Sequence, residues 1–240
     1  SNIIKLEENE MVVDAIAVSD FNKRLDVVLT SKNGMIKKTS LEEFKVSRYS
    51  KPISCMKLKD NDEVVSVFLS VYNNILVATN KCYSLWFDIS EVPSSGIKSS
   101  GVKAIALKDD YVVSSVNFDD DMLYVSVFTD KGTAKRVKLS EFEKGTRARR
   151  GLMILREVKT NPYRVIKVFV NDKCSFGIKS VSGINVIKST ELNICDRYQT
   201  GSSISSSEVL DVFMVKDLEK DIDIDISSND KDEVLEDDID

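Results

Sequence analysis

The chain has 240 residues, of which 42% are hydrophobic and 30% charged, with a formal net charge of −5, four cysteines and no histidine. This hydrophobic fraction is typical of a folded protein rather than a disordered one. The lack of histidine and of any C-x-x-C pair argues against a zinc site, and no run of about 18 apolar residues indicates a membrane span or a secretory signal. We therefore expect a cytoplasmic protein with isolated, reduced thiols and no association with a membrane.

Charge is divided unevenly along the chain. Residues 217–240 carry twelve acidic residues against Lys220 and Lys231, a net charge of −10, whereas residues 1–216 have a net charge of +5. A basic body favours an anionic partner, and an acidic tail can compete with that partner. We expect residues 1–216 to form the folded domain and residues 217–240 to be a disordered tail.

Four segments of the chain repeat one plan at intervals close to 50 residues. Each segment has a first strand pattern, a turn and a second strand pattern, which together are typical of a β-hairpin. The segments are residues 26–44, 74–92, 123–142 and 174–192. The expected turns lie at Asn33-Gly34, Asn80-Lys81, Lys131-Gly132 and Ser182-Gly183.

A loop and a further strand pattern follow each hairpin, as in residues 53–69 and 102–118. Residues 3–18 match these second halves without a hairpin before them, so the sequence holds four complete repeats and the end of a preceding one. A period near 50 residues with four strands per unit predicts an all-β, propeller-like arrangement of four-stranded blades. Spacing alone also permits other β-repeats, but the agreement of four repeats favours blades.

Basic residues gather in the loops after the hairpins and in the strands before them. Between Lys131 and Lys167 there are twelve basic and three acidic residues, a net charge of +9. Because the same loop recurs on each blade, its cations should line one outer rim and bind the phosphates of duplex DNA without reading bases. Gly96 and Gly101 would allow the backbone a close approach. The candidate DNA-binding residues are Lys37, Lys38, Lys45, Arg48, Lys51, Lys98, Lys103, Lys135, Arg136, Lys144, Arg147, Arg149, Arg150, Arg156 and Lys188.

Catalytic and metal sites receive little support. The dipeptides Arg48-Tyr49 and Arg197-Tyr198 fall in loops of the repeat, where we expect packing or phosphate contact rather than a tyrosine nucleophile. The alternation of Asp221, Asp223 and Asp225 resembles a Mg²⁺ ligand pair but lies in the acidic tail. We expect no catalytic residue, metal or cofactor in residues 1–240.

The repeats resemble the C-terminal β-pinwheel family of the A subunits of DNA gyrase and topoisomerase IV. The similarity is carried by NGMIKKTSLEEFKVSRYSKP (33–52), GVKAIALKDDYVV (101–113), KLSEFEKGTRARRGLMILREVKTNPYR (138–164) and DRYQTGSS (196–203). It is strongest to the topoisomerase IV member (ParC) of Gram-positive bacteria. Members of this family have about six blades, which implies that one full blade and part of the next lie upstream. The Q-R-R-G-G-R-G box of gyrase has no match, and its nearest equivalent is residues 147–151.

The resemblance implies a DNA-wrapping domain of an ATP-dependent type II topoisomerase. In that setting the domain presents bent duplex DNA to the strand-passage core in chromosome segregation, within the bacterial cytoplasm and nucleoid. Its partners would be duplex DNA, the ATPase B subunit, and the remainder of the A subunit, while Mg²⁺ and ATP would bind other domains or subunits. The gyrase A domain is the alternative within the class, and a propeller that scaffolds protein partners is an alternative from another class. A scaffold predicts a neutral rim, which the basic stretch argues against.

Overall fold

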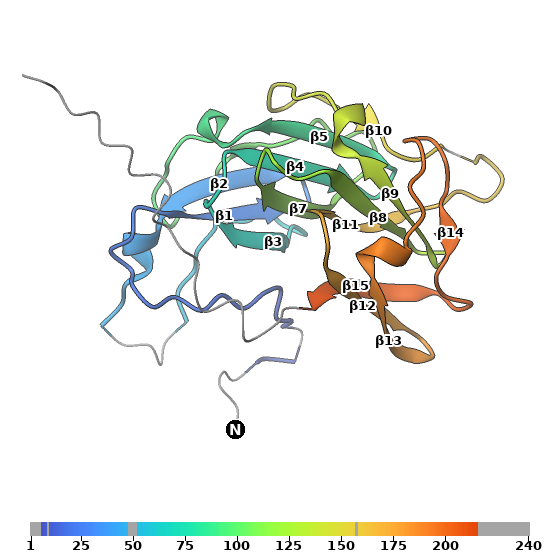
Figure 1. Ribbon diagram of the computed structural model, residues 1–240. Helices are drawn as coiled ribbons and strands as arrows, with labels where there is room; N and C mark the ends of the chain where they lie inside the picture. The colour runs from blue at the N-terminus through green and yellow to red at the C-terminus, as the bar shows by residue number, and fades with distance from the viewer. Residues whose placement is uncertain (1–5, 9, 48–51, 157, 216–240) are drawn as a thin grey trace, which may run out of the picture.

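The computed structural model describes residues 6–8, 10–47, 52–156 and 158–215, and it consists almost entirely of β-strands in four sheets (Figure 1). The first sheet has the strand order β3-β1-β2-β6. The second has the order β10-β5-β4-β7, the third β11-β8-β9-β14 and the fourth β13-β12-β15. This is the all-β, bladed architecture that the repeat predicts, and the prediction of the fold class is confirmed.

The strand bounds follow the 50-residue repeat. The first sheet comprises β1 (Asp26–Ser31), β2 (Met35–Ser40), β3 (Val64–Leu69) and β6 (Val102–Lys103). The second comprises β4 (Asn74–Thr79), β5 (Tyr83–Asp88), β7 (Val112–Phe118) and β10 (Leu152–Met153). The third comprises β8 (Tyr124–Thr129), β9 (Thr133–Lys138), β11 (Val165–Asn171) and β14 (Ser202–Ser203). The fourth comprises β12 (Ser175–Ser180), β13 (Gly183–Lys188) and β15 (Val209–Val215).

A short 3₁₀ turn follows the second hairpin strand of each blade. These turns are η1 (Leu41–Phe44), η2 (Ile89–Glu91), η3 (Leu139–Glu141) and η4 (Ser189–Glu191). The hairpin turns lie where the sequence predicts them, and Gly34 and Gly132 have positive φ angles of 79° and 70°. In the second hairpin this conformation falls on Cys82, with a φ of 67°, rather than on the preceding Asn80-Lys81 pair.

Each of the first three blades borrows its fourth strand from the next repeat. Val102 of β6 pairs with Ile36 of β2, although the two residues belong to consecutive repeats. Strands β10 and β14 pair with β5 and β9 in the same way. The prediction of four strands per blade therefore holds for these blades, but a blade is not one continuous repeat. The sequence could not show this exchange, because hydrogen-bond partners across repeats leave no periodic pattern.

The predicted strand near the N-terminus is absent from the described residues 10–18, which are irregular. In the other repeats the equivalent strand pairs with the first strand of its own hairpin, as β7 does with β4. In the described part of the chain no hairpin strand pairs with residues 10–18, so these residues form no β-ladder.

Apolar cores fill the spaces between consecutive blades. Val28 of the first blade packs in one core with Ile75 and Val77 of the second. Phe128 of the third blade lies 4.9 Å, between ring centroids, from Phe176 of the fourth. Because a blade is covered on both faces, β4 is buried along its whole length and reads as a continuous apolar run rather than an alternating one.

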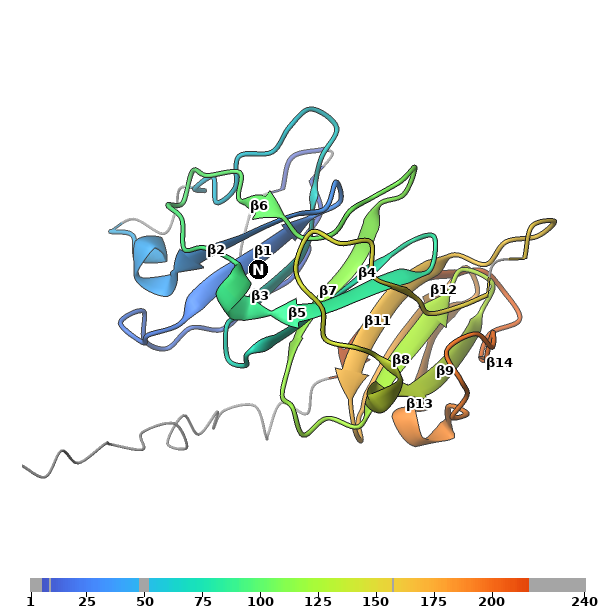
Figure 2. The same ribbon diagram turned by 90° about the horizontal axis from the view of Figure 1, so that it is seen from above.

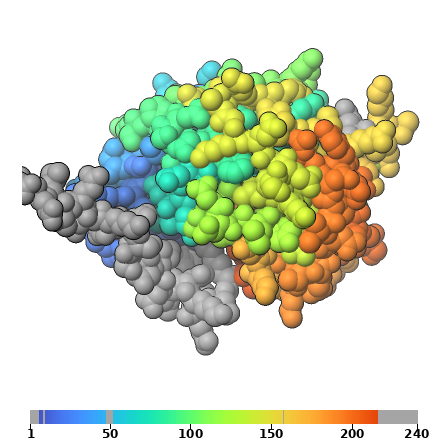
Figure 3. All heavy atoms as spheres, turned by 45° about the horizontal axis from the view of Figure 1, so that its top comes forward, coloured from blue at the N-terminus to red at the C-terminus, as the bar shows by residue number. Residues whose placement is uncertain are grey.

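The strands β3, β7, β11 and β15 lie on the inner side of the blades, and the hairpin strands β2, β5, β9 and β13 lie further out (Figures 1 and 2). The blades follow one another across the molecule in chain order (Figure 3). Residues 65–68 of the first blade and 211–214 of the last line the same central hollow of about 410 Å³. None of the helices in the described ranges has the length and apolar character that crossing a bilayer requires.

Candidate nucleic-acid interface

Three equivalent loops, which we call the rim loops, run along the outer hairpin strands of the first three blades. They are residues 93–101, 143–151 and 193–201. Each rim loop belongs to one repeat and lies against the preceding blade, through the parallel bridges Lys38–Ser94, Trp86–Lys144 and Arg136–Ile194. The loops are therefore backed by strands over part of their length.

Each rim loop ends on a glycine that touches the neighbouring blade. Gly101, Gly151 and Gly201 have φ angles of +74°, +82° and +83°. A Cβ atom at Gly151 would lie 2.0 Å from the carbonyl oxygen of Ser84, well inside van der Waals contact. Only glycine combines this backbone conformation with so close an approach. The glycine thereby directs the chain into the borrowed strand.

Two of the predicted DNA contacts are wrong, because Lys37 and Lys135 are fully buried. The Lys37 ammonium donates hydrogen bonds to the carbonyl oxygens of Cys55, Gly96 and Ile97, at 2.9, 2.8 and 2.8 Å. An ammonium with three protein acceptors and no exposed surface cannot reach a phosphate.

The Lys135 ammonium is held in the same way two blades further on. It donates to the carbonyl oxygens of Asp196, Arg197 and Gln199, at 3.1, 2.8 and 2.6 Å. Burial lowers the pKa of Lys135 from its ordinary value to about 8, and it also lowers the pKa of Lys37. Both lysines therefore bind backbone carbonyls of a rim loop from the strand that lies beneath it.

Arg147 and Arg150 are partly engaged within the protein. The Arg147 guanidinium donates to the carbonyl oxygen of Glu91 at 3.0 Å and to that of Lys103, and its backbone N–H donates to the Glu91 carboxylate at 2.8 Å. The Arg150 guanidinium lies 3.9 Å from the ring centroid of Tyr83. Arg147 therefore links two repeats, and the half-buried Arg150 stacks on a ring of the preceding repeat.

Other predicted cations are half-buried or paired. The Arg136 guanidinium lies over the Tyr124 ring at 4.7 Å and donates to the Leu192 carbonyl at 3.2 Å. The Lys144 ammonium forms an ion pair with Asp88 at 2.8 Å, which lowers the pKa of that carboxyl to about 2. Lys38 is half-buried on β2. These side chains keep some exposed surface and stay candidates.

The remaining predicted cations that the structure describes are exposed. They are Lys45, Lys98, Lys103, Arg149, Arg156 and Lys188. Lys45 donates a long hydrogen bond of 3.3 Å to Asn22. Arg48 and Lys51 lie outside the described residues. Exposed cations thus occur on or beside the rim loops of consecutive blades.

Arg197, for which the sequence suggested packing or phosphate contact, was not among the candidate DNA-binding residues. Arg197 occupies the position in the last rim loop that Arg147 occupies in the one before, and its guanidinium lies 5.2 Å from the ring centroid of the exposed Tyr198. Aligning the rim loops by their terminal glycines would have found it from the sequence alone.

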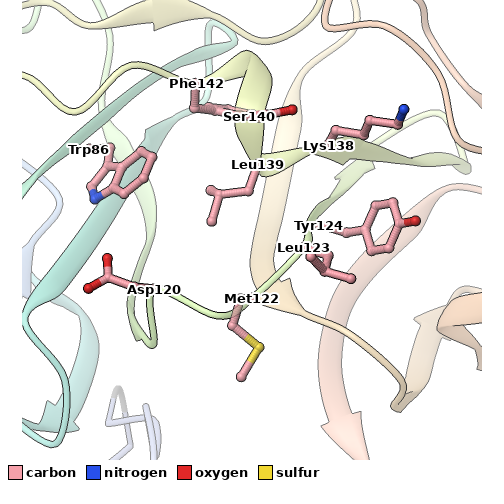
Figure 4. A pocket seen from close by; sticks show the side chains of 9 residues that line it. All are labelled: Trp86, Asp120, Met122, Leu123, Tyr124, Lys138, Leu139, Ser140 and Phe142. Atoms are coloured by element: carbon pink, nitrogen blue, oxygen red, sulfur yellow. The ribbon is translucent and has the colours of Figure 1, made fainter.

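A groove of about 530 Å³ lies between the second and third blades (Figure 4). Trp86 and Tyr124 line it from different blades, together with the apolar Met122 and Leu139. The Trp86 indole N–H donates to Asn74 at 2.9 Å, and its ring packs against Phe118. Within the described ranges, no group of three or more His, Cys, Asp or Glu side chains is placed to hold a metal.

The fold and its loops define a class: a propeller-like protein of 50-residue blades with exchanged strands and cationic loops along one rim. A model of the family described as DNA gyrase C-terminal domain, beta-propeller, matches residues 25–70, 73–117 and 123–172. These stretches make up more than half of the chain, and the chain belongs to this family. The resemblance seen in the sequence is confirmed.

Several similar relatives and a similar solved structure are from topoisomerase IV. The chain is 36% identical over 214 residues to the A subunit of DNA topoisomerase 4 from Bacillus subtilis (strain 168), covering 87% of this chain and 26% of that protein. It is 38% identical over 168 residues to the corresponding protein of Staphylococcus epidermidis (strain ATCC 12228 / FDA PCI 1200), covering 69% and 21%. The chain thus spans about a quarter of the length of these relatives.

The structural comparison agrees with the sequence comparison. The crystal structure of the C-terminal domain of DNA topoisomerase IV has a TM-score of 0.84 and 37% identity, and covers 90% of this chain and 69% of that chain. The DNA gyrase A C-terminal domain has a TM-score of 0.78 at 16% identity, covering 89% and 73%, and shares the fold. Gyrase is therefore the less favoured alternative.

Proposed function

We propose that the rim loops bind the phosphate backbone of duplex DNA and bend it along the edge of the blades. The observation that carries this proposal is the recurrence of exposed cations on equivalent loops of consecutive blades, such as Lys98 and Arg149, with Lys103 on the strand β6 that follows the first of these loops. Bending 20–30 base pairs through 40–90° costs on the order of 1–6 kcal/mol, so contacts from several blades are needed to offset it. One loop alone would not suffice.

Within the A subunit of a whole type II topoisomerase, the domain would present this bent segment to a strand-passage core. The names of the relatives support that setting. We propose that the chain itself has no catalytic residue, and that ATP and Mg²⁺ act on other domains or on the B subunit. Addition of ATP and Mg²⁺ to the 240-residue chain with supercoiled plasmid should then leave the plasmid topology unchanged.

A salt titration of duplex binding tests the proposal. If about six phosphates are neutralised, log K should fall with log[salt] at a slope near −5. Several unrelated duplexes of equal length should bind with similar affinity, because the cations contact phosphates and not base edges. Fluorescence anisotropy at salt concentrations from about 50 to 200 mM measures both quantities.

Two outcomes would contradict the proposal. A flat salt response would show that the rim cations do not release counterions from DNA and would favour a protein-binding scaffold instead. A strong preference for one sequence would show direct base readout, for which the described loops offer no helix or strand fitted to the major groove.

A further inference from the structure

In the first and third blades, two side chains hold a rim loop by hydrogen bonds to the C=O and the N–H of the same peptide unit. In the first blade the Lys37 ammonium donates to the Gly96 carbonyl at 2.8 Å, while the next N–H, that of Ile97, donates to the Glu43 carboxylate at 3.0 Å. Because a peptide unit is planar with its C=O and N–H on opposite sides, the two side chains fix the orientation of its plane.

The third blade repeats this arrangement with different residues. Lys135 donates to the Asp196 carbonyl at 3.1 Å, and the Glu141 carboxylate accepts the N–H of Arg197 at 3.0 Å. The lysine and the glutamate are six residues apart in both blades, the lysine on the second hairpin strand and the glutamate in the 3₁₀ turn. We call each pair a peptide clamp.

The second blade keeps half of the clamp. Glu91 accepts the N–H of Arg147 at 2.8 Å, but the strand position six residues earlier is Leu85. There the Arg147 guanidinium ties the loop to the preceding repeat at other points, by donating to the carbonyls of Glu91 and Lys103. The second blade therefore restrains its rim loop without a strand lysine.

Burying an ammonium group is costly unless acceptors replace its water, and a methionine would fill the same volume without that cost. Lys37 and Lys135 nevertheless occupy the same strand position, each with three carbonyls of or beside the rim loop as acceptors. The residue after each clamped peptide is exposed: Lys98 in one loop and Tyr198 in the other.

We propose that the pairs Lys37–Glu43 and Lys135–Glu141 are positioning residues that pre-order the rim loops for contact with the DNA backbone. The inference rests on the proposed function of these loops. None of the four side chains needs to touch DNA itself; each pair sets the direction in which the exposed side chains of its loop leave the backbone. Pre-ordering raises affinity because less conformational freedom is lost on binding.

The test compares variants of the 240-residue chain by duplex-DNA affinity and by hydrogen exchange of residues 193–201. Lys135→Met and Glu141→Leu should each speed exchange in this loop and weaken affinity about three- to tenfold, the range expected for one hydrogen-bonded anchor. Glu141→Gln should stay close to the unaltered chain in both measurements. It removes the same negative charge as the leucine but keeps an acceptor for the Arg197 N–H, so it separates loop positioning from a change in charge.

Two matched controls occupy the same repeat positions without a complete clamp. Leu85→Met changes the strand position of the second blade, and Glu191→Leu changes a glutamate whose carboxylate bonds the N–H of Lys188 in its own turn. Both should leave the exchange of residues 193–201 and the DNA affinity unchanged. If Lys135→Met does not fold, Glu141→Leu and Glu141→Gln test the same peptide from its other side.

Faster loop exchange with unchanged affinity would overturn the proposal, as would unchanged exchange in both Lys135→Met and Glu141→Leu. Equal weakening by Glu141→Gln and Glu141→Leu would also overturn it, since an acceptor for the Arg197 N–H would then not be the property that matters. Absence of DNA binding by the unaltered chain would refute the proposed function, whereas full binding by the clamp variants refutes the clamp alone.

Discussion

Arg147 and Arg149 are two residues apart in the same rim loop, but their surroundings differ. The Arg147 guanidinium bonds two carbonyls of a neighbouring repeat, whereas Arg149 is exposed. Arginine can serve either task because its planar fork donates several hydrogen bonds at once. The sequence cluster Arg147, Arg149 and Arg150 therefore separates into a structural residue, an exposed cation and a cation stacked on Tyr83.

We expect Arg149→Ala to weaken DNA binding and to lower the magnitude of the salt slope by about 1, with little change in unfolding. Arg147→Ala should instead lower the free energy of unfolding by about 1–2 kcal/mol, because it removes charge-assisted hydrogen bonds at a half-buried site. Salt-dependent anisotropy and urea unfolding of the two variants check both statements. The opposite assignment would follow if Arg149→Ala were the destabilised variant.

Lys135 gives a pH dependence whose sign follows from its burial. Its pKa is about 8 in the folded chain and near its ordinary 10.5 when unfolded, so above pH 8 the unfolded chain binds more protons. The free energy of unfolding should therefore rise between about pH 8 and 10, by up to about 1.4 kcal/mol per pH unit from this group.

Lys135→Met should abolish that increment. The relevant quantity is the difference between the two proteins, because Cys82, whose pKa burial raises to about 11, contributes with the opposite sign. Denaturant unfolding from pH 7 to 10 measures the difference. If the difference stayed constant with pH, Lys135 would not titrate in this range.

The rim loop is the element on which the proposed function depends. Its backbone conformation is set by contacts with the preceding blade and by the borrowed strand into which it leads. A terminal glycine lets each loop enter the sheet of the preceding blade, and a glutamate in the 3₁₀ turn of that preceding blade accepts one of the loop's N–H groups. A loop tethered at several points keeps its cations in place at low entropic cost on binding. The borrowed strands make every rim loop part of two blades.

The acidic segment 217–240 lies outside the described residues, and its effect on the rim stays a prediction. With a net charge of −10 it should compete with DNA for the exposed cations. Deleting residues 217–240 should tighten DNA binding at low salt and matter little at high salt, because salt screens charges that are not buried. Unchanged affinity in anisotropy titrations at both salt concentrations would show that the segment does not compete.

In the molecule as a whole, the blades share their cores with their neighbours rather than enclosing cores of their own. Leu76 of the second blade and Val127 of the third lie in one apolar cluster. A blade between two others therefore has a neighbouring blade packed against each of its faces. Such packing holds the rim loops of consecutive blades in a fixed relation. That relation is what a stiff duplex requires of a surface that bends it.

Much of the fold and of the charge distribution could be predicted from the sequence. The 50-residue period, the hairpin turns at Gly34 and Gly132 and the bladed all-β fold follow from local patterns, because strand alternation and turn chemistry act over a few residues. The family was identified separately, by the resemblance of four segments to known members. The charge contrast between residues 1–216 and 217–240 needs only counting.

The tertiary structure decided which cations face solvent. Lys37 and Lys38 are adjacent on β2, and both fit a basic strand, yet Lys37 is buried under a loop from the next repeat and Lys38 is half-exposed. Alternation along a strand says that neighbours point to opposite faces, but not which face another repeat will cover. That depends on contacts between residues about 60 positions apart, for which the sequence carries no local pattern.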